Sequence, residues 1–370
     1  MRKQYYQKMV LLVLWIIVQW FLLWRNGIVT SLEADKYISQ AHFFLNTGTL
    51  SGNNYWLYST QVFLIAAAIK LHMGFAIIVI IQFLLNLLST WMFYKLALKF
   101  LNDPVTPFLA TFFFIINIPY QVYNSFLFTE SIFYSLTIIY SSYLRRLNRI
   151  TVARLLIIIL FLAFLSVTRP TGFLFFGATA LYIFSRFLNH IALWKKGIII
   201  CSALIVFFAV LNMMLQSGGS LDFMLPFKKE NIICGVSTTN NTEIKTSEKG
   251  NSLQGILYYI LNNKKQFLRL ATLKTISFFG LVRNYYSTFH NIFLVIIFYP
   301  FYILSFAGAW KLIRRKQRIF YYLSAIIVLY WITTLLTCDD WHNRFVLTVF
   351  PFIFLVGFSA FTKEKNDQLT

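Results

Sequence analysis

Two carboxylates lie close together just after the first apolar segment of the chain. Glu33 and Asp35 belong to the stretch SLEADKYISQAHFFLNTG, residues 31–48. A carboxylate can act as a general base, taking the proton of a hydroxyl group as that hydroxyl attacks. Residues two positions apart do not share a helix face, so at most one would point at a given substrate atom. The alternative is a solvated helix start, in which Ser31 and the acids serve as ordinary caps.

Two arginines stand where long apolar runs meet polar sequence. Arg169 lies in the tight turn TRPTG, residues 168–172, and Arg344 opens the last apolar run in HNRFVLTVFPF. A charge at such a position is costly unless it reaches the membrane interface or a partner. A guanidinium group matches the oxygens of a phosphate, so each arginine could hold a lipid phosphate. The alternative is that both side chains extend to the headgroups without a specific ligand.

Further polar residues occur near apolar segments. Glu130 lies one turn into an apolar run, in FLFTESIF, where it would be a functional candidate or a structural partner of Arg169. Asp339, Asp340 and His342 form the cluster Cys-Asp-Asp-Trp-His. Such a cluster could bind a divalent cation, but the sequence favours a solvated loop, and we expect no metal.

The composition is that of a membrane protein. Of 370 residues, 58% are hydrophobic and 12% are charged, whereas soluble domains carry about 25% charged residues. The net charge of +21 comes from Lys and Arg in short links between apolar runs, where they orient membrane helices. We therefore exclude nucleic acid as a partner and expect membrane lipids instead.

Eleven apolar runs are candidate spans, at residues 9–24, 56–71, 75–97, 107–120, 126–144, 152–168, 171–188, 197–215, 289–310, 319–337 and 345–361. The second run is doubtful, because only residues 62–69 are continuously apolar and would cover roughly 12 Å of a core about 30 Å thick. If it does not span, the basic clusters of four consecutive links all fall in the cytoplasm. We therefore expect an all-α polytopic protein with about ten transmembrane helices, cytoplasmic termini and a juxtamembrane helix at 56–71.

In this topology residues 1–370 form a single integral membrane domain with two large outer loops. Residues 25–74 are the first outer loop with its juxtamembrane helices, and residues 216–288 are the long outer loop. The end of the long loop, residues 253–282, mixes apolar and basic side chains and suits a helix on the headgroups. Cys234 and Cys338 fall on the same outer side and could pair in an oxidising compartment, but two unpaired thiols are the expected state.

Several short motifs together are similar to a known family. They are Glu33, Tyr37 and Ala41 in the first outer loop, Thr129-Glu130, the Arg-Pro-Thr-Gly of residues 169–172, and Arg344-Phe345 before Pro351. This arrangement resembles the GT-C superfamily of integral membrane glycosyltransferases, with the protein O-mannosyltransferase-like and aminoarabinose transferase-like enzymes as the nearer relatives.

The resemblance implies a reaction and its residues. An acidic residue of the first outer loop would be the catalytic base, and the donor would be a sugar on a polyprenyl phosphate. Glu33 stands four positions before Tyr37, where the family usually has Asp, so the choice between Glu33 and Asp35 stays open. Arg169 and Arg344 would stabilise the leaving phosphate during a single inverting displacement, which many members of the family perform without a metal.

The remaining expectations concern the supporting groups and the setting. Glu130, Tyr37, His342 and Asp340 are expected to support the site. The acceptor would be a glycan, a lipid or a protein. The resemblance places the enzyme in the bacterial inner membrane, with its active site on the outer face and a role in cell-envelope polysaccharide biosynthesis.

Three other functions are alternatives to glycosyl transfer. A polysaccharide polymerase or ligase would rely on outer arginines and on His290 or His342 rather than on a first-loop carboxylate. A flippase for lipid-linked sugars, or another transporter, would place charges near the membrane midplane, whereas the charges here fall at the ends of the apolar runs. A non-catalytic membrane subunit is the third alternative.

Overall fold

The fold was determined as a computed structural model that describes residues 2–101, 103, 105–187, 193–216, 222–237, 244–245 and 250–362. Within these residues the regular structure is helical, and the only extended pairings are the isolated bridges Val29–Phe126 and Ile233–Asp339. The predicted all-α class is confirmed for this part of the chain.

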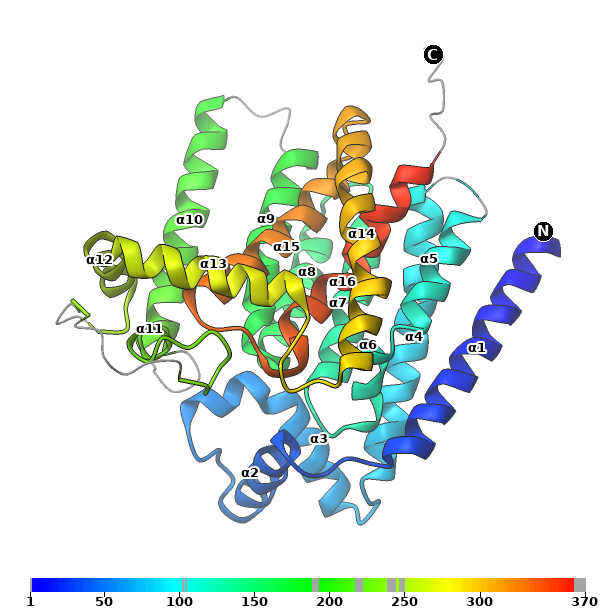
Figure 1. The fold of residues 1–370 in the computed structure, drawn as a ribbon, viewed down its shortest axis with the longest axis horizontal. Helices are drawn as coiled ribbons and strands as arrows, with labels where there is room; N and C mark the ends of the chain where they lie inside the picture. The colour runs from blue at the N-terminus through cyan, green and yellow to red at the C-terminus, as the bar shows by residue number, and fades with distance from the viewer. Residues whose placement is uncertain are drawn as a thin grey trace.

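Each of the ten segments predicted to span forms a helix, and these helices run side by side along the bundle (Figure 1). They are α1 (Arg2–Asn26), α4 (Ala76–Leu101), α5 (Thr106–Ile115), α7 (Glu130–Arg146), α8 (Val152–Thr168), α9 (Leu174–Phe187), α10 (Leu193–Gln216), α14 (Thr288–Arg314), α15 (Arg318–Leu336) and α16 (Arg344–Phe358). Further helices lie in the connections between them: α2 (Glu33–Thr47), α3 (Ser59–Lys70), α6 (Ile118–Gln121), α11 (Met224–Lys228), α12 (Leu253–Asn262) and α13 (Lys264–Gly280).

Five stretches of the described chain are long and apolar enough to cross a membrane. They are Gln4–Asn26, Ala76–Leu101, Thr288–Arg314, Arg318–Leu336 and Trp341–Phe361. Helices α5 and α8 are apolar but shorter. The 17 residues of α8 cover about 25 Å, against a hydrocarbon core of about 30 Å. The structure therefore supports an α-helical membrane protein, and the full number of spans stays a prediction.

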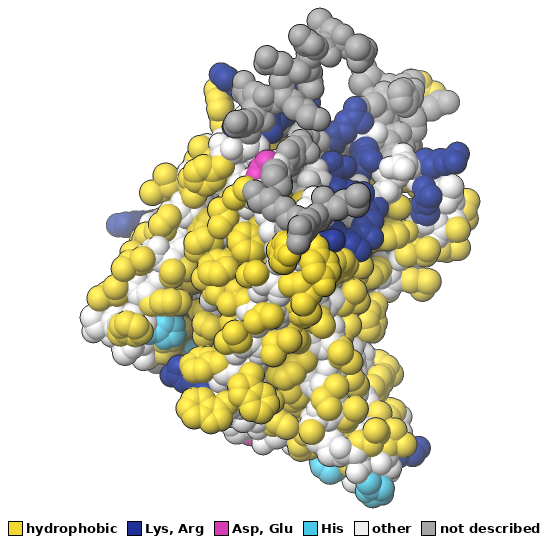
Figure 2. All heavy atoms as spheres, turned by 90° about the vertical axis from the view of Figure 1, so that its right-hand side faces the viewer, with side chains coloured by type: hydrophobic (Ala, Val, Ile, Leu, Met, Phe, Trp, Pro, Cys, Tyr) yellow, Lys and Arg dark blue, Asp and Glu magenta, His cyan; other side chains and the backbone are white. Residues whose placement is uncertain are grey.

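Helix α16 lies at the centre of the bundle and α1 lies at its edge. Of the apolar stretch that contains α16, 78% is buried, and α14 and α15 pack against it. A Cβ atom at Gly308 of α14 would stand 1.9 Å from the carbonyl oxygen of Val356, so this close approach requires glycine. By contrast, Trp20 and Trp24 of α1 expose most of their surface. Apolar side chains cover much of the face of the molecule drawn in Figure 2. An exposed apolar face of this extent fits contact with lipid.

The two ends of the bundle carry different charges. Glu33, Glu130 and Arg344 begin α2, α7 and α16, and with Arg169 and Asp340 they define what we call the carboxylate end. The opposite end, called the basic end, is formed by Arg145, Arg146, Arg186, Lys311, Arg314, Arg315, Lys316 and Arg318. Lys and Arg side chains gather there above the apolar face in Figure 2. This segregation is the pattern from which the orientation was predicted.

Residues 56–71 occupy a short helical segment at the carboxylate end. The 3₁₀ turn Asn53–Tyr58 leads into α3, whose 12 residues cover about 18 Å. Helix α3 packs against α2 and α8 and lies below the long helices in Figure 1. Its length fits the juxtamembrane position that the sequence predicts.

Cysteine labelling tests the predicted orientation. Asn46, at the carboxylate end, and Asn148, at the basic end, are both exposed, so each tolerates a reporter cysteine in a Cys201→Ser background. A membrane-impermeant maleimide applied to intact cells is expected to label Asn46→Cys, and to label Asn148→Cys only after lysis. The reverse pattern would show that the basic end faces outward.

Candidate functional site

Two arginines and two carboxylates form a closed ring at the carboxylate end. Arg169 places its guanidinium 2.6 Å from Glu130 Oε1 and 2.8 Å from Asp340 Oδ2. Arg344 places its own guanidinium 2.9 Å from the same Glu130 oxygen and 2.7 Å from Asp340 Oδ1. Positive and negative groups therefore alternate around what we call the arginine–carboxylate ring. Sequence had suggested Glu130 and Arg169 as a pair, and the structure confirms this contact.

The ring is buried. Only 1% of the Glu130 side chain and 8% of the Arg169 side chain are exposed. Removing an ion from water costs several kcal/mol, so buried charges persist only where partners satisfy them. One donor is left over, because Nε of Arg344 is buried without an acceptor in the described structure. A dense set of buried charges with a spare donor is a functional candidate.

Glu33 joins this ring from the first turn of α2. One of its carboxylate oxygens pairs with Arg344, and the other accepts from Lys36 Nζ at 2.8 Å and from the Tyr37 hydroxyl at 3.2 Å. The Glu33 side chain is 22% exposed, so it is the most accessible of the carboxylates that contact the arginines. The structure thus brings a predicted base into contact with a predicted phosphate-binding arginine that lies 311 residues away in sequence.

Asp35 is not part of this network. Its side chain is exposed and makes no hydrogen bond or ion pair with any described residue; only its backbone N–H donates, to the Leu32 carbonyl at 3.3 Å. Ser31 does not cap α2, because the helix begins after Leu32 and has no side-chain cap, whereas both acids do lie in its first turn, as the alternative expects. Leu32 adopts φ 62°, a backbone conformation that is strained for leucine and that places Glu33 at the start of the helix.

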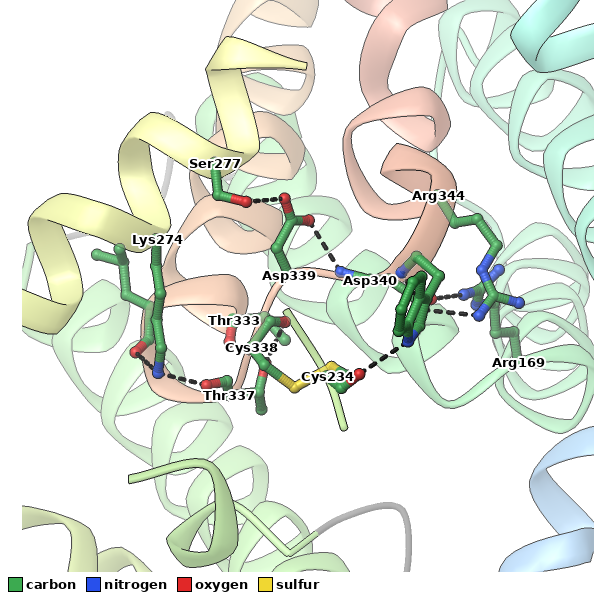
Figure 3. Close-up of a disulfide and its surroundings, with 12 residues drawn as sticks. Arg169, Cys234, Lys274, Ser277, Thr333, Thr337, Cys338, Asp339, Asp340 and Arg344 are labelled. Carbon is green, nitrogen blue, oxygen red and sulfur yellow. Dashed lines mark hydrogen bonds and ion pairs between the residues drawn. A yellow bond between two sulfur atoms is a disulfide. The ribbon is translucent and has the colours of Figure 1, made fainter. Parts of the chain in front are cut away.

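A disulfide fixes the loop that carries Asp340. Cys234 and Cys338 are bonded, so the expectation of two unpaired thiols is wrong (Figure 3). The bridge is reinforced by backbone pairing between Cys234 and Asp339 at 2.9 Å and by the Trp341 indole N–H, which donates to the Cys234 carbonyl at 2.8 Å. The loop from residue 338 to Arg344 is therefore held at its start by the bridge.

The expectation of a solvated loop for the Cys-Asp-Asp-Trp-His cluster is wrong for its two acids. Asp339 is fully buried, pairs with Arg283 and accepts from Ser277 Oγ at 2.8 Å, while Asp340 belongs to the ring. His342 is exposed and lies beside the Tyr286 ring, 3.5 Å from its hydroxyl. No group of three potential ligands for a metal ion occurs among the described residues.

Burial governs the protonation of both aspartates. Loss of hydration raises the pKa of Asp339, and Arg283 opposes this shift. Loss of hydration likewise raises the pKa of Asp340 to about 7, against the attraction of Arg169. The charged form of each carboxyl thus depends on its guanidinium partners, which explains why a buried arginine accompanies each of them.

Sequence reasoning missed Arg283 and Lys274, which support the loop from the side of α13. Lys274 is buried, donates to the carbonyls of Thr337 and Leu335, and lies 4.4 Å from the Phe227 ring centre. Burial lowers the pKa of Lys274 to about 7. Lys274 lies in α13 and Arg283 follows that helix, in a stretch rich in basic residues, so residue type alone does not distinguish these two buried cations from surface ones.

Lys274 gives the protein a pH-dependent stability. Its pKa is lower in the folded chain than in the unfolded one, where it is near 10.4, so the unfolded state binds more protons between these values. Between pH 7 and pH 10 the stability of the wild type should therefore rise relative to Lys274→Met, by at most about 1.4 kcal/mol per pH unit. Thermal unfolding in a neutral detergent, with Cys201 replaced by Ser in both proteins, measures this difference. A constant difference across that range would contradict the prediction.

Comparison with known proteins yields no relative: no family model, no curated protein and no solved structure matches this chain. The functional assignment therefore depends on the site itself.

Proposed function

We propose that this protein is a membrane glycosyltransferase of the GT-C type, which moves a sugar from a polyprenyl phosphate to a glycan, lipid or protein acceptor. The observation that carries the proposal is the meeting of Glu33, Arg344 and Arg169 in one network at the end of an apolar bundle. A carboxylate base and two phosphate-binding cations are the groups that transfer from a lipid-linked donor needs.

The proposed setting is a bacterial inner membrane crossed by ten helices, with the carboxylate end outside. Two features support this orientation. The Cys234–Cys338 disulfide lies near the carboxylate end, and disulfides persist in oxidising compartments. The basic side chains gather at the opposite end, as expected for cytoplasmic links.

The proposed reaction is a single displacement. The acceptor hydroxyl oxygen attacks C1 of the sugar, a C1–O bond forms, and the bond from C1 to the phosphate oxygen breaks with its electron pair. Glu33 takes the hydroxyl proton, and the polyprenyl phosphate leaves without needing a general acid. Glu33 suits this role better than Asp35, because it is both partly exposed and joined to Arg344.

The arginines would bind the donor phosphate and stabilise the negative charge that develops on it as it leaves. Their fixed guanidinium groups are held by Glu130 and Asp340, so they need little reorganisation when the negative charge grows. Nε of Arg344 is a buried donor not yet used by any described residue. Tyr37, which donates to Glu33, would position the base.

Substituting the two acids separately distinguishes them. Glu33→Gln should lower transfer at least 100-fold, within the range for loss of a general base, whereas Asp35→Asn should stay within about twofold of wild type. The assay supplies membranes with a panel of radiolabelled polyprenyl-phosphate hexoses and pentoses and follows release of polyprenyl phosphate. Equal amounts of inserted protein are the control. Full activity in Glu33→Gln and in the double variant would refute the catalytic role.

Binding of the donor lipid tests the arginines without needing the acceptor. Arg344→Lys keeps one positive charge but cannot contact Glu33, Glu130 and Asp340 together or offer a phosphate a planar fork. We expect undecaprenyl phosphate to bind this variant about tenfold more weakly than wild type, measured by native mass spectrometry. Arg269→Lys is the matched control, because the half-exposed Arg269 side chain pairs with Glu230, a carboxylate outside the ring. Equal binding by all three proteins would remove Arg344 from the donor site.

A further inference from the structure

A cavity of about 320 Å³ lies at the basic end, where α7 and α9 end and α15 begins. Four of the side chains that line it are cationic, and none of its lining residues is acidic. The cations are Arg145, Arg186, Lys316 and Arg318. Four like charges around a small volume repel one another, so an anion in the cavity would be favourable.

The cationic side chains are partly fixed in place. Arg186 bonds to the Tyr182 hydroxyl, and Arg318 Nη1 donates to the Arg186 carbonyl at 2.7 Å. Nε of Arg145 is buried and has no acceptor in the described structure. None of the described ion pairs involves Arg145, Lys316 or Arg318. Donors are therefore available in the cavity wall.

The start of α15 adds to the positive potential. This helix of 19 residues begins at Arg318, and its N-cap Gln317 gives no side-chain cap. The free N–H groups at a helix N-terminus carry a partial positive charge and favour anions. The start of α15 therefore favours an anion in the cavity, as the four cationic side chains do.

We propose that this cavity binds a phosphate group, carried by an anionic lipid headgroup or by a small soluble phosphate. A guanidinium group can bond to two phosphate oxygens at once, which suits the three arginines of the wall. The volume is at the small end of the range for ligand sites, about 300–1,000 Å³, so it accommodates a headgroup rather than a whole lipid. Orienting a membrane helix requires only basic residues on one side, and does not require a shared cavity with an unpaired buried donor.

The site is separate from the proposed catalytic network. The cavity lies at the basic end, and the arginine–carboxylate ring lies at the carboxylate end, beyond the length of α7. The phosphate held here would therefore not be that of the sugar donor. An anionic headgroup at this end would hold the C-terminal turns of α7 and α9 against the start of α15.

Two probes and two matched variants test the site in the full-length protein. Pyrophosphate is titrated calorimetrically in a neutral detergent, and phosphatidylglycerol retention is measured by native mass spectrometry against phosphatidylcholine. The double variant Arg145→Gln/Arg318→Gln removes two cavity cations. The control Arg146→Gln/Arg314→Gln removes the same charge from the same end at residues that do not line the cavity. Lys316→Gln, an exposed position, replaces the double variant if the latter unfolds.

At least one probe should bind the double variant about tenfold more weakly than wild type, and the control should stay within about twofold. A difference confined to phosphatidylglycerol identifies a lipid headgroup as the ligand. A difference confined to pyrophosphate identifies a soluble phosphate. No binding of either probe to wild type, or equal losses in the cavity variant and the control, would overturn the proposal.

Discussion

The site depends on the alternation of positive and negative charges among buried side chains. Glu130 and Asp340 each touch both Arg169 and Arg344, so every buried charge in the ring has two opposite neighbours. Loss of one member would leave the others buried without a counter-charge. Breaking a buried ion pair in this way destabilises a folded protein by about 3–5 kcal/mol. Because Glu130, Arg169 and the Asp340–Arg344 segment are far apart in the sequence, the ring also fixes how α7, the α8–α9 turn and the start of α16 meet.

The surrounding structure serves to hold the loop that supplies Asp340 and Arg344. The disulfide at Cys338, the buried pair of Asp339 with Arg283, and the Lys274 contacts to two carbonyls all act on a few consecutive residues. Each of these contacts comes from the 216–288 loop or from α13 within it. The long loop is thus a structural part of the site, whichever substrate the protein takes.

The sequence predicted the helices well because long apolar runs have few alternatives in a membrane. It also identified Arg169, Arg344 and Glu130, since charges beside such runs need partners. It could not choose between Glu33 and Asp35, because the rotation of α2 is set by packing and by the strained Leu32 rather than by local pattern. Unpaired thiols were preferred over the disulfide, and the burial of Asp339 was missed, for a related reason: the bridge joins residues 104 positions apart, and contacts at that distance leave no local signal.

The order in which the chain is made has a consequence for the ring. Glu33, Glu130 and Arg169 are synthesised early, whereas Asp340 and Arg344 come from the last described segments. Synthesis proceeds from the N-terminus, so the early members enter the bilayer without half of their counter-charges. Likewise, Cys234 can form its disulfide only after Cys338 has been synthesised. Until α16 is made, Glu130 and Arg169 therefore have only each other as counter-charges, and the ring can close only when the last described helix packs against the earlier ones.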